Sequence, residues 1–219
     1  MSLTETAEHA IWKVAAYASE DSIHRLLLTG CRGLIAKLTT APILNVEFRP
    51  GKKLELSSLN SIFTNLRELR VACTHLGYTL RGFGEDVKAC KPMEKLRSLE
   101  LDFSRSVLLL KAVPSLPSTF PNLESLSLHS NSRLLRDLFR MGEWRSVLPP
   151  KLKRFTVSAL PDPPCTWVLY PSDIAEFPRT LEELDVPFFQ IFIDPKKEEQ
   201  IAWPPKLTSL TCKLSAISE

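Results

Sequence analysis

A short pattern of apolar residues recurs along most of this chain and limits the folds open to it. In the pattern, a leucine is followed three residues later by an apolar residue, and two residues after that by another. Clear copies begin at Leu66, Leu96, Leu123, Leu152, Leu181 and Leu207, and a weaker first copy is formed by Ile43, Val46 and Phe48. Successive copies begin 23 to 30 residues apart. Apolar residues at alternate positions are typical of a short strand with one buried face, so the pattern predicts one such strand per copy.

A single unit of this kind cannot bury its apolar face, whereas stacked units bury a continuous core. Connections of this length are long enough to join neighbouring strands in parallel. We therefore expect an α/β fold in which about seven strands, one for each copy, form a parallel sheet. The alternative, unrelated amphipathic strands within a compact α/β domain, agrees less well with six clear copies that share similar flanking residues.

Prolines stand directly before four of the copies. They occur in the segments FPNL (120–123), LPPKL (148–152), FPRTL (177–181) and WPPKL (203–207). Proline cannot donate a hydrogen bond to a sheet, and it biases the residue before it away from helix. We expect each proline to mark the point where a connection turns back into a strand. The large apolar residues before the prolines, which we expect to fill the gap between connection and sheet, are Phe120, Leu148, Phe177 and Trp203.

The pattern and its period resemble those of the leucine-rich repeat family. The segment LESLSLHSN, residues 123–131, also carries Asn131, the asparagine that closes the corner between strand and turn in that family. The equivalent positions in other copies hold Thr74, Ser104, Leu160 and Phe189. The resemblance implies a right-handed leucine-rich repeat solenoid over residues 42–219, with an irregular or helical convex side.

The connections between strands form the convex side of such a solenoid. Helices are expected at residues 105–113, 133–144, 172–177 and 194–202. In the last of these, Asp194 is placed to cap the helix and Pro195 suits its first position. The proline-rich segment at 158–172 is instead expected to be irregular and extended.

Residues between the apolar positions are expected to face solvent on the concave side, because side chains alternate along a strand. This predicted surface mixes both charges with hydroxyl groups and is mildly acidic, which suits a protein partner better than nucleic acid. A strand face that is merely solvated is the alternative. The predicted partner-binding residues are Glu68, Arg70, Glu100, Asp102, Ser127, His129, Arg154, Thr156, Glu183 and Asp185. In the first copy, Glu47 is expected in the central row of this surface, level with Arg70 and Glu100.

The N-terminal region, residues 1–41, has the periodicity of short helices. Ser19 is placed to cap a helix whose first turn holds Glu20 and Asp21. The segment SIHRLLLTGCRGLIAKL, residues 22–38, resembles the latter part of an F-box, although LTETAEHA stands where that family usually opens with Leu-Pro. The resemblance implies that this region binds a ubiquitin-ligase adaptor. The residues that would divide between the adaptor face and the helix core are Ile11, Trp12, Tyr17, Ile23, Leu26, Leu27 and Leu34. Alternatively, these helices only cap the end of the solenoid.

Composition and motifs favour a protein without catalytic chemistry. The five cysteines are odd in number and widely spaced, which favours reduced thiols in the cytoplasm or nucleus over a disulfide framework. The sequence lacks the common metal, nucleophile-elbow and phosphate-loop motifs, so no cofactor, metal or enzymatic activity is expected. The net charge of +3 is spread along the chain, and neither nucleic-acid binding nor a membrane span is expected. We expect His129, beside Asp102, to be a recognition contact rather than a general base.

An aromatic cluster follows the sixth predicted strand, counting the weaker first copy, in VPFFQIFIDP at 186–195. We expect Phe188, Phe189 and Phe192 to belong to the core. The alternative is that one or two of them project at the rim of the concave face, where they would anchor a partner.

Together these patterns indicate a non-catalytic protein–protein interaction module. The F-box resemblance implies a substrate receptor of a cullin-type ubiquitin ligase, with the adaptor on the N-terminal helices and the substrate on the concave face. The alternative is a structural scaffold subunit of a larger assembly. In either case the last strand, near residues 207–214, is expected to leave an edge that can pair with another chain.

Overall fold

The computed structural model describes residues 40–48, 56–73, 87–103, 116–131, 148–160, 167–193 and 202–216. The predicted N-terminal helices, with all the proposed adaptor-binding residues, lie outside these ranges. The helices predicted at 105–113 and 133–144, and all but the last residue of the one at 194–202, lie outside them as well.

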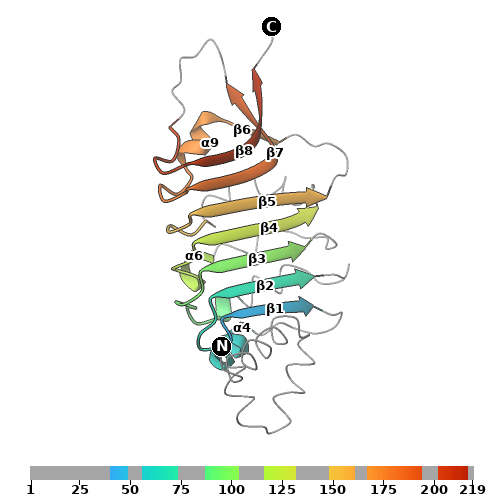
Figure 1. Ribbon diagram of the computed structural model, residues 1–219, viewed down its shortest axis with the longest axis vertical. Helices are drawn as coiled ribbons and strands as arrows, with labels where there is room; N and C mark the ends of the chain where they lie inside the picture. Colours follow the sequence, from blue (N-terminus) through green and yellow to red (C-terminus); the bar gives the residue numbers. More distant parts are fainter. Residues whose placement is uncertain are drawn as a thin grey trace, which may run out of the picture.

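Eight strands in the described part of the chain form a single sheet (Figure 1). They are β1 (Ile43–Phe48), β2 (Glu68–Cys73), β3 (Ser98–Phe103), β4 (Ser125–Asn131), β5 (Arg154–Leu160), β6 (Trp167–Leu169), β7 (Glu183–Ile193) and β8 (Ser209–Ala216). The order runs β1-β2-β3-β4-β5-β7, and both β6 and β8 also pair with β7. All these pairings are parallel. The predicted α/β fold with parallel strands is confirmed.

The register of the sheet aligns the second apolar residue of each clear copy in one continuous row. Leu69 pairs with Leu99, and the row continues across the sheet through the residues Leu126, Phe155, Leu184 and Leu210. These side chains are buried from Leu69 to Leu184. A row of apolar side chains repeated on neighbouring strands makes a continuous core, which here runs from β2 to β7.

The first copy begins two residues earlier than the sequence pattern indicated. Leu44 pairs with Leu69, so Ala41, Leu44 and Val46 take the places predicted for Ile43, Val46 and Phe48. The prediction was wrong because the first apolar position holds the small Ala41, which is fully buried but does not stand out in a leucine pattern. As a consequence Asn45, not Glu47, is level with Arg70.

Each clear copy begins with the same four-residue turn. The backbone N–H of the copy's leucine donates to the carbonyl three residues earlier, as from Leu66 to Phe63 at 3.3 Å and from Leu207 to Pro204 at 3.0 Å. The same bond occurs at Leu96, Leu123, Leu152 and Leu181. Proline stands at the first or second position of four of these turns, where no N–H is needed for the turn's hydrogen bond. The prediction that the prolines mark the entry into a strand is confirmed for these four turns.

A second backbone contact ties each turn to the copy before it. The carbonyl of Arg67, for example, accepts hydrogen bonds from the N–H groups of Arg97 at 2.7 Å and Ser98 at 2.9 Å. The carbonyls that accept such a pair of bonds are those of Pro42, Arg67, Arg97, Glu124, Lys153 and Glu182. Because this contact recurs at every boundary between copies, the connections can differ in length while the strand register stays constant.

Three of the four apolar residues that precede the prolines fill the interior as predicted. Phe120, Leu148 and Phe177 are buried, and the ring centroid of Phe177 lies 6.3 Å from that of Phe155 on β5. Trp203 is an exception, because 37% of its surface is exposed. The reason is positional: Trp203 belongs to the entry turn of β8, and in the described structure no further strand lies beyond β8.

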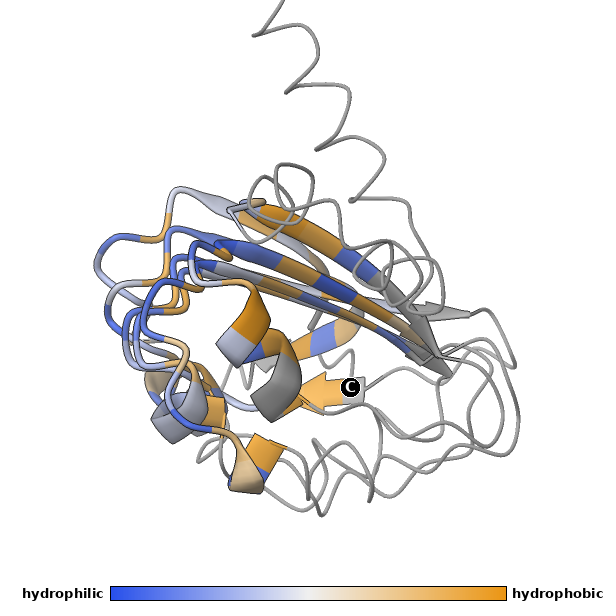
Figure 2. Ribbon diagram, turned by 90° about the horizontal axis from the view of Figure 1, so that it is seen from below, coloured by the Kyte–Doolittle hydropathy of each residue, from blue (hydrophilic) through white to orange (hydrophobic). Residues whose placement is uncertain are grey.

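Short helices cover the apolar side of the sheet (Figure 2). They are α4 (Leu56–Ile62), α6 (Leu116–Thr119) and α9 (Pro171–Ala175). The helix predicted at 172–177 corresponds to α9, in which Pro171 takes the first turn and the side chain of Asp173 accepts a hydrogen bond from the N–H of Tyr170 at 3.0 Å.

The segment at 158–172 is more regular than predicted. β5 continues to Leu160, and the three residues of β6 pair with β7. No pattern in the sequence indicated β6, because three residues are too few to show an alternation.

β7 is longer than its neighbours and belongs to two parts of the sheet. Its first residues pair with β5, and its last residues pair with β6 and with the end of β8, with a register irregularity between Asp185 and Gln190. Phe189 lies within this irregular segment and is buried, so its predicted core role is confirmed. The side chains of Phe188 and Phe192 lie outside the described part.

Candidate functional site

The face of the sheet opposite the core, named here the open face, is lined by residues that alternate with the buried ones. Figure 2 shows the described helices on the other side of the sheet. The central row of the open face is Asn45, Arg70, Glu100, Ser127, Thr156, Asp185 and Thr211. All ten predicted partner-binding residues lie on the open face, in the central row or in the two rows beside it, and all are at least partly exposed.

One cluster of charges spans β2, β3 and β4. The Nε atom of Arg70 lies 3.2 Å from Oε2 of Glu100, and Nε2 of His129 lies 3.7 Å from Oε1 of the same carboxylate. Asp102 is level with His129 in the strand register, as the sequence predicted. Glu100 therefore faces a basic side chain on each neighbouring strand, an arginine at ion-pair distance and a histidine that is charged only when protonated.

A second charge pair lies farther along the open face. Nε of Arg154 on β5 lies 3.8 Å from Oε2 of Glu183 on β7, and both side chains are more than half exposed. Along the central row, the hydroxyl residues Ser127 and Thr156 stand between the charged residues Glu100 and Asp185. The central row thus has neutral, hydrogen-bonding residues at its middle and charged residues on either side.

A third set of charges lies where the chain enters the strands, and sequence reasoning missed it. Glu124 Oε2 accepts a hydrogen bond from Nζ of Lys153 at 2.7 Å, and Glu124 Oε1 lies 3.6 Å from Nε of Arg97. The bond from Lys153 lowers the pKa of Glu124 below its ordinary value and raises the pKa of Lys153. A signal for this set is present in the sequence. The residue directly after the first leucine is Arg97, Glu124 and Lys153 in three successive copies, so its charge alternates in sign.

The entry turns also bond to one another through side chains. Lys95 Nζ donates to Asn65 Oδ1 at 2.8 Å, and Lys151 Nζ donates to Asn122 Oδ1 at 2.6 Å. The sequence pattern placed a stabilising asparagine at Asn131, on the far end of the strand, but that side chain lies outside the described part. The asparagines seen to link copies are at the strand entrance instead.

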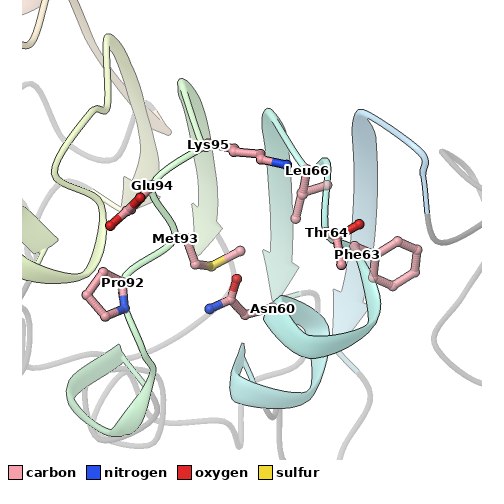
Figure 3. Close-up of a pocket in the computed structure, with 8 residues that line it drawn as sticks. All are labelled: Asn60, Phe63, Thr64, Leu66, Pro92, Met93, Glu94 and Lys95. Carbon is pink, nitrogen blue, oxygen red and sulfur yellow. The ribbon is translucent and has the colours of Figure 1, made fainter.

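A cavity of about 270 Å³ lies beside two of these entry turns, away from the open face (Figure 3). It is lined by Asn60, Phe63, Thr64, Leu66, Pro92, Met93, Glu94 and Lys95. Its volume is below the range of about 300–1,000 Å³ that is usual for small-molecule sites. Two of its polar side chains are engaged, since Asn60 Nδ2 donates to the carbonyl of Lys91 at 3.1 Å and Lys95 bonds to Asn65.

Two further observations bear on the chemistry of the described residues. They contain no group of three or more histidine, cysteine or acidic side chains arranged to hold a metal ion. Their helices are also too short or too polar for any of them to cross a bilayer.

Comparison of the chain with protein-family models, with curated proteins and with solved structures gives no significant match.

Proposed function

We propose that this chain is a solenoid of the leucine-rich repeat type and that its open face binds a protein partner without catalysing a reaction. The solenoid interpretation is supported by the sequential order of parallel strands, by the entry turn shared by successive copies and by the core row that runs from Leu44 to Leu184. In such an array each copy contacts only its neighbours, and the strands present an extended surface to a partner.

The observation that carries the binding proposal is the arrangement of charges on the open face. Glu100 lies between Arg70 and His129, and Arg154 lies beside Glu183. Charged side chains that are already oriented by their neighbours lose less conformational freedom when a partner binds. Both signs of charge are present, which suits a protein surface of complementary pattern better than a uniformly negative nucleic acid.

In its concrete form the proposal is a substrate receptor of a cullin-type ubiquitin ligase. Support for this form comes from the sequence, where residues 8–40 resemble an F-box. The substrate would then bind the open face and the adaptor would bind the N-terminal helices. If the helices only cap the solenoid, the open face would serve in a scaffold subunit of a larger assembly.

Affinity purification from cells that express the chain tests the binding proposal. Asp185→Lys reverses a charge in the central row, and Glu176→Lys makes the same change just after α9, on the opposite side of the sheet. We expect Asp185→Lys to lose the specific partner while Glu176→Lys retains it, with both variants folded by circular dichroism. Equal recovery of the partner by both variants would contradict binding at the open face.

A separate variant tests the receptor form. Leu26→Glu places a charge in the F-box-like segment and leaves the open face unchanged. We expect it to lose the ligase adaptor and keep the open-face partner. Recovery of assembly subunits without any adaptor by the unmodified chain would favour the scaffold instead.

A further inference from the structure

The copy that contains β8 leaves partly exposed four positions that the preceding copy buries. Leu210 is 37% exposed, whereas Leu184, its neighbour in the same row, is 1% exposed. Trp203 is 37% exposed, whereas Phe177 at the same place in the preceding copy is 4% exposed. Leu207 and Cys212 are only partly buried against the core. We name these four residues, Trp203, Leu207, Leu210 and Cys212, the end surface.

The backbone of β8 is open along the same side. In the described part of the chain β8 pairs with β7 alone, and it lies at the opposite end of the sheet from β1 (Figure 1). The N–H of Ser209 donates to Glu182 on the β7 side. Because peptide groups alternate in direction along a strand, those of Leu210 and Cys212 point away from β7. An edge strand with free peptide groups and apolar neighbours is a template for pairing with another chain.

The sequence of β8 is suited to pairing with itself. Its eight residues, SLTCKLSA, are polar at each odd-numbered position and apolar at each even-numbered position from Leu210 to Ala216. When two such strands meet antiparallel about a two-fold axis at Cys212, Leu210 comes opposite Leu214 of the second copy. Lys213, the charged residue of β8, comes opposite Thr211 of the second copy, so like charges do not meet. Even-numbered positions therefore stay on one side of the joined sheet.

We propose that the end surface and the free edge of β8 bind a second copy of this chain, by antiparallel pairing of the two β8 strands about a two-fold axis. The two sheets then continue into one another, and the end surfaces of both copies cover each other. This is an isologous interface, in which the same patch serves on both subunits. The open face remains accessible in such a dimer, so dimerisation and the proposed partner binding are independent.

Sedimentation of the full chain and of two matched variants tests the proposal. Leu210→Lys places a charge in the end surface, and Ser209→Lys places the same charge on the adjacent residue, on the open face. We expect the unmodified chain and Ser209→Lys to sediment as dimers at micromolar concentration. Leu210→Lys should weaken the dimer by a factor of roughly ten or more. A monomeric unmodified chain, or a Leu210→Lys dimer as stable as that of Ser209→Lys, would overturn the proposal.

Cross-linking of the unmodified chain tests the same arrangement without a substitution. In an antiparallel pair centred on Cys212, the two Cys212 Cα atoms are about 5.5 Å apart, because their peptide groups bond across the strands. A short bis-maleimide should therefore join Cys212 to Cys212 of the second copy, as identified by mass spectrometry of the linked peptides. Links between copies that involve other cysteines but not Cys212, or assemblies that grow beyond two copies, would contradict the two-fold interface.

Discussion

Glu124 and Lys153 stand 29 residues apart in the sequence, and their side chains are joined by a hydrogen bond of 2.7 Å at the entrance of neighbouring strands. The bond illustrates a general feature of this fold, in which residues at the same position of successive copies lie next to one another in space. The carboxylate of Glu124 also faces Arg97, so it is shared between the copy before and the copy after.

This pair gives a prediction about pH. A carboxyl group with a lowered pKa in the folded chain adds stability above its unfolded pKa, and this is lost as the pH falls through the folded pKa. For Lys153, whose pKa is raised, the contribution is present below the unfolded pKa and is lost as the pH rises through the folded pKa. The pair therefore makes its full contribution to folding stability only at pH values between the ordinary pKa ranges of glutamate and lysine. It should be small and reduced by salt, because both side chains are exposed.

Carbon NMR of the Glu124 carboxyl group measures this effect. We expect its titration midpoint to lie below the ordinary glutamate range and to rise in Lys153→Gln. Lys151→Gln is the matched control, since Lys151 bonds to Asn122 instead. The same midpoint in the unmodified chain and in Lys153→Gln would contradict the assignment.

The strands could be predicted from the sequence because the signal for them is periodic. Leu69, Leu99 and Leu126 recur at the same place in each copy, so their alignment in one row follows from the pattern itself. Since strand side chains alternate, the residues of the open face follow directly as well. The first copy was misplaced because Ala41 is small, and a small buried residue cannot be told from a surface alanine by pattern alone.

The contacts made by the turns could not be predicted in the same way. Asn122 and Glu124 are ordinary polar residues in the sequence, and their partners come from copies 28 and 29 residues away. The exposure of Trp203 was also unexpected, because WPPKL has the same form as FPRTL. Whether Trp203 is buried depends on whether another copy covers its turn, and the local motif does not indicate this.

The buried hydroxyl of Thr119 gives a second prediction. Thr119 Oγ1 donates to the carbonyl of Val87 at 2.8 Å, and its own carbonyl accepts from the N–H of Met93 at 2.7 Å. Thr119→Val keeps the shape but leaves the Val87 carbonyl without this donor, so the free energy of unfolding should fall by about 1–3 kcal/mol. Thr119→Ser retains the hydroxyl and should lose less. Urea denaturation of both variants makes the comparison, and a valine variant as stable as the serine variant would show that the bond contributes little.

Asn122 bridges three copies and gives a third prediction. Its Nδ2 donates to the carbonyl of Glu94 at 2.9 Å, and its Oδ1 accepts from Nζ of Lys151 at 2.6 Å. Asn122→Ala removes both bonds and should lower the free energy of unfolding by about 1 kcal/mol. Lys206→Ala changes the equivalent position of a later turn, where the described residues offer no such bridge, and should leave stability nearly unchanged. The bridging role would be refuted by equal urea midpoints for Asn122→Ala and the unmodified chain.

The last prediction compares two leucines in the same core row. Leu184→Ala removes a side chain that is 1% exposed and leaves a cavity between neighbouring strands, which should cost about 2–5 kcal/mol of unfolding free energy. Leu210→Ala removes a side chain that is already 37% exposed, so water can fill the space and the loss should be about 1 kcal/mol. Urea unfolding followed by circular dichroism measures both, at a protein concentration where sedimentation shows a monomer, so that association through β8 does not add to the stability of Leu210. Equal losses would mean that Leu210 is buried in the monomer, and the end surface would then be covered by the chain itself.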